Sequence, residues 1–292
     1  FVAVSFNEEF SEIISIAVEN DYQRKGIGSN LLNYIINRPY FAGNLIIDVA
    51  INNEEGIKFY DQSLALYDDL AGELDFNLMF SRQGHFTLGH STAAVSGLVT
   101  RAENNKALGV DSYVLEPQEI KKMLPEIDIT DHPRFPVHGA LYHPPGGIIR
   151  HDAVVWAYAR GADRKGVQIH QLTEVQDIIV ENGKASGVVT NRGTVSCNTV
   201  ISVVAGWSSE VCKKVNVKLP FVTHPLQALV TQSYKPWLNH VVVSGTLHIY
   251  LSQTDRGELV CGNGIDTYPH YGMLSTLGFL ESYAAHVLEL FP

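Results

Sequence analysis

Residues 248 to 266 read HIYLSQTDRGELVCGNGID, and they end a longer segment in which extended runs alternate with turns. That segment covers residues 224 to 264 and opens with a second run, HPLQALV, at 224 to 230. Runs rich in β-branched and aromatic residues favour strands, and short turns between them favour antiparallel neighbours. We therefore expect this part of the chain to supply much of a largely antiparallel sheet.

Helical patterns flank this segment. Apolar residues recur at helical spacing over residues 59 to 75, 93 to 108, 150 to 166 and 283 to 290. A further short helix is expected from Glu116 to Met123, with Pro117 in the first turn, where its missing N–H is tolerated. Residues 128 to 147 are rich in Pro, His and Gly and are expected to form a surface or cofactor-facing loop.

Two more stretches are predicted to be extended. Residues 76 to 88 read as two short strands about a turn at Gln83-Gly84. A β-rich block follows the helix that ends near Gly166, with runs at 167 to 172, 174 to 180, 187 to 190 and 193 to 204 and a turn at Glu181-Asn182-Gly183. The fold class is therefore mixed α/β, with a short α/β start and a main body made of a largely antiparallel sheet and helices.

Composition limits the function classes. The 292 residues are 45% hydrophobic, which is enough for one large domain or two ordinary ones. A net charge of -10 with scattered Lys and Arg argues against nucleic-acid binding. Three cysteines are too few and too widely spaced for a disulfide framework or a zinc site. Without an apolar run of about 20 residues or a signal-peptide pattern, no membrane contact and a cytoplasmic location are expected.

The start of the chain follows a pattern of its own. EIISIAV at 12 to 18 predicts a strand, and DYQRKGIGS at 21 to 29 then leads into a helical pattern. Gly26 and Gly28 permit a tight turn, and the free N–H groups at a helix start suit a pyrophosphate. An ordinary strand-to-helix turn would explain the same loop.

This start resembles part of a GNAT N-acetyltransferase. The resemblance covers residues 1 to 60 and rests on the loop Gln23-Arg24-Lys25-Gly26-Ile27-Gly28, which is similar to the family's pyrophosphate loop. Asn53, followed by Tyr60, resembles the family's next motif. The resemblance implies an acetyl-CoA site at these residues, with Tyr60 protonating the departing thiolate. After Tyr60 the chain leaves the family's pattern, so half of the wall on the acceptor side is missing.

From about residue 59 to the end, the chain resembles the β subunit of the heterotetrameric sarcosine oxidases, which are D-amino-acid oxidase-like flavoproteins. Four stretches carry this resemblance in the same order: FNLMFSRQG at 76, RHDAVVWAYARGA at 150, HPLQALV at 224 and the run at 248 to 266. We accordingly divide the chain into an acetyltransferase-like segment, 1 to 60, and a truncated oxidoreductase body, 61 to 292.

The resemblance implies two flavins. FAD would oxidise a secondary amino acid such as sarcosine. Electrons would then pass to an FMN that is joined covalently to His151, at the interface with a large α subunit. Small subunits would complete the heterotetramer. His151 opens a helix, whose positive dipole favours the neutral imidazole that can attack a flavin methyl carbon. A histidine at a helix start is otherwise a cap or a surface group.

Further FAD contacts are implied at four residues. The family holds the adenine end at the position of Val175 and lets the turn Ala205-Gly206-Trp207 approach the ribose and phosphates. Tyr250 stands where related amine oxidases place an aromatic residue beside the substrate. Ordinary packing of a strand valine, a strand-end glycine and a strand tyrosine is the alternative reading.

The chain also departs from the family. No G-x-G-x-x-G follows a first strand, and so the loop that binds the FAD pyrophosphate is absent, as are the substrate-binding arginine and the lysine near the flavin. Weak FAD binding and impaired activity are expected. Both ends, Phe1 and Pro292, are expected to be internal points of a longer protein. Two alternatives stay open: an acetyltransferase fragment on a non-catalytic scaffold, and a flavin-free interaction module.

Overall fold

The computed structural model describes residues 2–6, 11–16, 54–131 and 133–292. These described residues fall into two compact units. One holds the two N-terminal strands together with residues 168–224, and the other holds residues 54–167 and 225–292. The helix α3 (Glu54–Leu74) runs without a break across the predicted boundary at residues 60 and 61.

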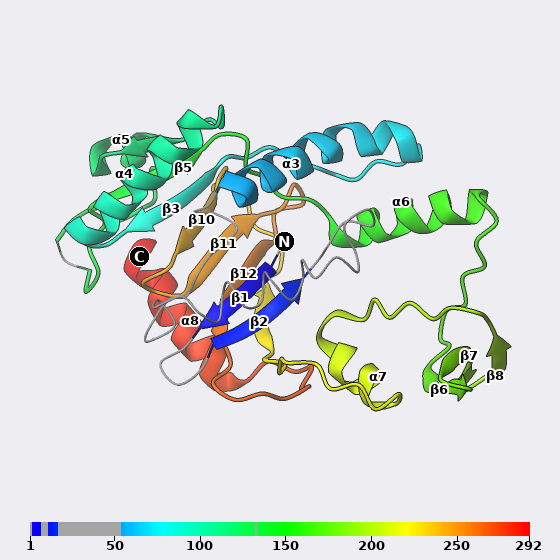
Figure 1. Cartoon of the computed structure of the whole chain (residues 1–292). Helices are drawn as coiled ribbons and strands as arrows, with labels where there is room; N and C mark the ends of the chain where they lie inside the picture. Colours follow the sequence, from blue (N-terminus) through cyan, green and yellow to red (C-terminus); the bar gives the residue numbers. More distant parts are fainter. Residues whose placement is uncertain (1, 7–10, 17–53, 132) are drawn as a thin grey trace. The chain divides into compact units, whose positions relative to one another are not determined.

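A seven-stranded sheet forms the larger unit (Figure 1). Its strands, in spatial order, are β4 (Tyr113–Leu115), β5 (Gly139–His143), β3 (His85–Gly89), β10 (Val241–Ser244), β11 (Ile249–Gln253), β12 (Leu259–Ile265) and β9 (Leu226–Val230). The pair β3 and β10 is parallel, and the other neighbours are antiparallel. The prediction of a largely antiparallel sheet with helices is confirmed.

Two helices of this unit begin at a side-chain cap. In α4 (Thr92–Ala107) the Ser91 hydroxyl accepts a 3.1 Å hydrogen bond from the Ala94 N–H. In α8 (Leu277–Leu290) Thr276 does the same for the Phe279 N–H at 3.2 Å. Pro117 begins α5 (Pro117–Met123), as predicted, and α6 (His151–Arg164) begins at the expected histidine. Each cap satisfies a backbone donor that the helix itself leaves unpaired.

The main core lies on one face of the sheet. Alternating strand residues point to this face, among them Phe86 in β3, Val242 in β10 and Leu251 in β11. Phe279, Tyr283 and Leu290 of α8 and Ile120 of α5 pack in the same cluster. On the other face, Leu98 and Ala102 of α4 cover Leu141 of β5.

The smaller unit contains a three-stranded antiparallel sheet of β6 (Val175–Glu181), β7 (Lys184–Thr190) and β8 (Gly193–Ser196). Asn182 and Gly183 join the first two strands with φ angles of 52° and 75°, the left-handed pair that a tight hairpin requires. The short helices η3 (Ala205–Trp207) and α7 (Ser208–Lys213) follow. The strands β1 (Val2–Phe6) and β2 (Ser11–Ile16) form an antiparallel pair.

Four predicted segments differ from the structure. Residues 76–80 form no strand because Asp75 and Met79 take positive φ angles of 50° and 53°, which break an extended run. Leu172 has a φ of 52°, and residues 167–172 are irregular, as are residues 198–204. The predicted loop at 128–147 contains β5, because GALYH has an apolar centre that the sheet buries between β3 and β4.

Among the residues that the structure describes, no helix combines the length and the apolar character needed to span a bilayer.

Candidate active site

An uncharged row of residues crosses the face of the sheet opposite the main core. Tyr250 of β11 stands directly opposite Val243 of β10 and Gly262 of β12, and Gly262 stands opposite Ala228 of β9. Directly opposed residues of antiparallel strands share one face, so these four lie side by side. Tyr250 is 39% exposed, and Leu226 and Val230 of β9 are 69% and 64% exposed. This open sheet face, as we call it, presents apolar surface and one phenol.

The Tyr250 ring reaches across to the neighbouring strand. A Cβ atom on Gly262 would lie 2.1 Å from Cε1, 2.2 Å from Cζ and 2.3 Å from Oη of Tyr250, which is far inside any real contact distance. The outer edge of the ring therefore occupies the space that a side chain at position 262 would need. Partial burial, with a smaller effect from the Cys261 thiol, raises the pKa of Tyr250. At neutral pH this phenol is an uncharged hydrogen-bond donor.

A second tyrosine supports this strand from the core side. The Tyr283 hydroxyl in α8 donates a 2.8 Å hydrogen bond to the backbone carbonyl oxygen of Tyr250. Tyr283 and Cys261 are both buried. Burial, followed by its hydrogen bond with Cys261, raises the pKa of Tyr283, and burial raises the pKa of the Cys261 thiol. Both groups are neutral, so α8 holds β11 in place without a buried charge.

His151 is the first residue of α6 and is exposed to solvent. The two sequence neighbours of His151 form an ion pair. The Arg150 guanidinium donates to the Asp152 carboxylate, with 3.0 Å between Nε and Oδ1. This hydrogen-bonded pair lowers the pKa of Asp152. Arg150 also approaches the Met79 sulfur at 3.8 Å. The imidazole therefore stands at a positive helix end beside a fixed ion pair, as the sequence predicted for its helix position.

The predicted FAD contacts Val175 and Ala205-Gly206-Trp207 lie in the smaller unit. Val175 begins β6, and the Lys214 ammonium just beyond α7 donates a 2.6 Å hydrogen bond to the carbonyl oxygen of the next residue, Gln176. This bond brings the end of α7, the helix that follows the turn, to the start of β6.

The turn itself is strained and clamped. Ala205 has a φ of 46°, a left-handed conformation that costs a non-glycine residue about 1–2 kcal/mol. The Ser208 hydroxyl donates to the Ala205 carbonyl oxygen at 2.7 Å. The Thr223 hydroxyl donates to the Gly206 carbonyl oxygen at 2.6 Å, and a Cβ on Gly206 would lie 3.0 Å from the Thr223 methyl. Backbone held this way suits close approach of a ligand.

The predicted acetyl-CoA residues Gln23, Arg24, Lys25, Gly26, Ile27, Gly28 and Asn53 lie outside the described residues. Tyr60 lies on α3, where it is exposed and meets the Phe59 ring edge-on at 6.0 Å. The acetyl-CoA site therefore stays a prediction.

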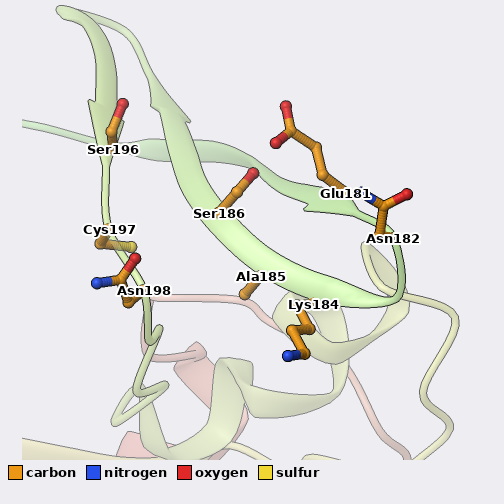
Figure 2. A pocket seen from close by; sticks show the side chains of 8 residues that line it. All are labelled: Glu181, Asn182, Lys184, Ala185, Ser186, Ser196, Cys197 and Asn198. Carbon is orange, nitrogen blue, oxygen red and sulfur yellow. The ribbon is translucent and has the colours of Figure 1, made fainter.

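One hollow opens beside the three-stranded sheet of the smaller unit, where strand residues such as Lys184 and Ser186 line it. Figure 2 shows Ser186 and Glu181 pointing to one side of the strands and Lys184 to the other. Its polar groups do not converge on one point, so the hollow offers no set of side chains for chemistry.

Comparison with known proteins identifies the family. Residues 32–292 match the family described as FAD dependent oxidoreductase. The chain belongs to this family. The match begins inside the predicted acetyltransferase-like segment and includes all of the larger unit's described elements.

Two curated relatives have the same printed name. The chain is 41% identical to the sarcosine oxidase subunit beta of Arthrobacter sp. over 239 residues, which cover 82% of this chain and 59% of that protein. It is 41% identical to the subunit of the same name from Rhizobium meliloti, over 80% of this chain and 56% of that protein. The chain thus spans less than two thirds of these relatives. The resemblance inferred from the four sequence stretches is confirmed.

Solved structures agree on the fold. L-proline dehydrogenase from P. horikoshii superposes with a TM-score of 0.75 at 25% identity, covering 84% of this chain and 65% of that chain. Glycine oxidase from Geobacillus kaustophilus gives a TM-score of 0.70 at 18% identity, over 82% of this chain and 64% of that chain, and this likeness shows the fold alone.

The described residues fit an FAD in part. In the larger unit, the uncharged apolar sheet face suits an aromatic ring system. In the smaller unit, taken by itself, the clamped turn at Ala205 and Gly206 suits a group that must approach backbone closely. The sequence analysis named Tyr250 and the turn, and their roles stay predictions. It missed Gly262, Tyr283 and Thr223, although a glycine inside a strand run is a signal of close approach.

Proposed function

We propose that this chain is the β-type subunit of a flavin-dependent amine oxidase that removes hydride from the carbon next to the nitrogen of a secondary amino acid such as sarcosine. The 41% identity to sarcosine oxidase β subunits over 239 residues carries the proposal. FAD, when bound, supplies the hydride acceptor. The open sheet face supports the proposal, because an amine must be neutral to give up hydride and an uncharged surface favours the neutral form.

Tyr250 has the role of a substrate-orienting donor in this proposal. Its raised pKa keeps the proton on the hydroxyl over the whole physiological range, so the phenol can donate to a carboxylate or accept from an amine. Val243 and Ala228, which lie in the same row, add apolar surface without contributing charge. The chain's part in the reaction is thus to orient the amine beside an uncharged surface.

Anaerobic reduction by sarcosine tests this function. The protein would be loaded with FAD and mixed with sarcosine without oxygen, and bleaching of the visible flavin band would be followed. We expect bleaching with N-methyl amino acids and slower bleaching in Tyr250→Phe. Tyr234→Phe, at an exposed tyrosine of the same unit, is the matched control and should behave as the wild type. FAD-loaded protein that no secondary amino acid bleaches would contradict the proposal.

We further propose that His151 carries a covalently attached FMN. Its solvent exposure, its place at the N-terminus of α6 and the fixed Arg150–Asp152 pair beside it support this assignment. Acid-precipitated protein should remain yellow, and His151→Ala should lose the colour. His170→Ala, at another exposed histidine, should keep it. Precipitated His151→Ala protein that is as yellow as the wild type would place the flavin elsewhere.

The proposed partners are a large α subunit and small subunits. The relatives are themselves named as β subunits. On α6, Val155 and Tyr158 are exposed and share a helix face with His151 by their spacing, so this apolar face is available to a partner at the proposed FMN site. Co-expression with a candidate large subunit should yield a complex that Val155→Asp weakens.

A further inference from the structure

We propose that Gly262 is a positioning residue, whose missing side chain lets the Tyr250 ring extend over β12 and so holds the phenol hydroxyl at the centre of the open sheet face. The inference rests on the proposed function in so far as Tyr250 meets the substrate. The contact between the two residues stands by itself.

The first argument is the space that the ring fills. Three atoms of the phenol, Cε1, Cζ and Oη, lie within 2.1–2.3 Å of the position that a Cβ on Gly262 would occupy. Gly262 is buried although its row neighbour Ala228 is exposed, because the ring covers it. The hydroxyl therefore stands above β12, one strand away from the backbone that carries it.

The second argument is that no positive φ angle requires glycine at position 262, although the register of β12 with β9 shifts just after it. Positive φ angles occur at other described glycines, such as Gly257 with 92°, but not at Gly262. At Gly257 an added Cβ would also lie 2.2 Å from the Tyr234 carbonyl oxygen. Glycine at position 257 is therefore required by the backbone conformation and by neighbouring backbone atoms. At Gly262 the three nearest atoms all belong to the Tyr250 side chain. The Tyr250 ring, which fills the space of a side chain, is therefore the reason that position 262 requires glycine.

The third argument is that the Tyr250 backbone is fixed. Its carbonyl oxygen accepts the Tyr283 hydrogen bond, and its strand is paired on both sides, with β10 and with β12. A side chain added at position 262 must therefore turn the ring about its own side-chain bonds, not move the strand. The hydroxyl would leave the row, and the ring would become more exposed to solvent.

A double-mutant cycle on thermal unfolding tests the contact without any flavin. We expect Gly262→Ala to lower the melting temperature in the wild-type background and to leave it unchanged in the Tyr250→Ala background, since the clashing ring is then gone. An equal loss in both backgrounds would mean that glycine serves the backbone, and it would overturn the inference. Gly245→Ala is the matched control, because an added Cβ there meets nothing within 4 Å.

Nitration by tetranitromethane, read out by peptide mass mapping, tests the position of the ring. Tyr250 should be nitrated about tenfold more slowly in the wild type and in Gly245→Ala than in Gly262→Ala, where the ring is free to leave the sheet. This order of magnitude corresponds to about 1.4 kcal/mol. If Tyr250 reacts at the same rate in all three proteins, Gly262 does not position it.

Flavin reduction by sarcosine then separates this inference from the proposed function. We expect Gly262→Ala to slow reduction by about tenfold to a hundredfold, and to have no further effect once Tyr250 is Phe. A chain that no amine reduces would contradict the proposed function while the unfolding cycle and the nitration still decide the role of Gly262. Normal reduction by Gly262→Ala would overturn the positioning role alone.

Discussion

The Thr223 hydroxyl donates a 2.6 Å hydrogen bond to the backbone carbonyl oxygen of Gly206. This bond closes over the turn in which Ala205 takes a φ of 46°. A residue just before the end of the smaller unit thus holds the turn that the family resemblance assigns to FAD. Strained backbone persists only where its surroundings hold it in place, and Thr223 provides part of that hold.

Removing this hydroxyl should loosen the turn. Thr223→Val keeps the shape of the side chain but leaves the Gly206 carbonyl without this donor, which should cost about 1 kcal/mol in the free energy of unfolding. FAD affinity should fall with it if the turn meets the ribose. Urea unfolding and flavin titration check both effects. Thr223→Ser retains the donor and should keep most of the affinity, and a Thr223→Val protein that matches the wild type in both would contradict the clamp.

Stability should depend on pH through His85. Burial, followed by the charges of Arg101 and His143, lowers the pKa of His85 from its ordinary value of 6.5 to about 4. Above pH 6.5 the imidazole is neutral in both the folded and the unfolded chain. As the pH falls from there towards 4, the unfolded chain takes up a proton that the folded chain does not, so the free energy of unfolding decreases.

The decrease in the free energy of unfolding that is due to His85 should reach about 3 kcal/mol at pH 4, since each unit of pKa difference is worth about 1.4 kcal/mol. Urea unfolding between neutral pH and pH 4 measures it. His85→Gln should show a flatter profile, and His170→Gln, at an exposed histidine, should follow the wild type. Identical slopes for His85→Gln and the wild type would show that this imidazole is not responsible. His90 and His143, whose pKa values burial also lowers, contribute to the slope that remains.

Gln253 should be among the polar residues most costly to replace. The residue is 3% exposed. Its side-chain oxygen accepts hydrogen bonds from the N–H groups of Trp237 and Leu238 at 2.9 and 3.0 Å, and its side-chain nitrogen donates to the Gly257 carbonyl oxygen at 3.0 Å. Gln253→Leu has a similar volume but leaves these buried groups unpaired, at about 1–3 kcal/mol for each. Thermal unfolding should show a large loss, whereas Gln118→Leu, on the exposed side of α5, should be nearly neutral.

Gly147 should tolerate no side chain. A Cβ there would lie 2.2 Å from the Ser81 carbonyl oxygen, at a crossing where Ser81 and Ile148 exchange backbone hydrogen bonds of 2.8 and 2.9 Å. Backbone cannot move aside as a side chain can, so Gly147→Ala should break this bridge and disturb the nearby Arg150. We expect a lower melting temperature and less flavin retained at His151. Gly72→Ala, in open space on α3, should instead stabilise the helix by about 1 kcal/mol.

Local features of this chain could be predicted from the sequence because neighbouring residues decide them. Pro117 at a helix start and Asn182-Gly183 in a hairpin act within a few residues, and both were located correctly. The four stretches that resemble the family in the same order also indicated the family, and the comparisons confirmed it. Tyr250 and the Ala205-Gly206 turn were named on that resemblance, and their roles stay proposals.

Only the tertiary structure placed the contacts between residues far apart in the chain. The strand β3 pairs in parallel with β10, which begins at Val241, and no local signal specifies a partner at such a distance. The irregular backbone at 76–80 and the burial of β5 were likewise decided by packing. The sequence determined most of the helices, among them α4, α5 and α6, because helix formation depends on near neighbours. Folding alone brought the Tyr250 ring over Gly262, because cross-strand register sets which two residues meet.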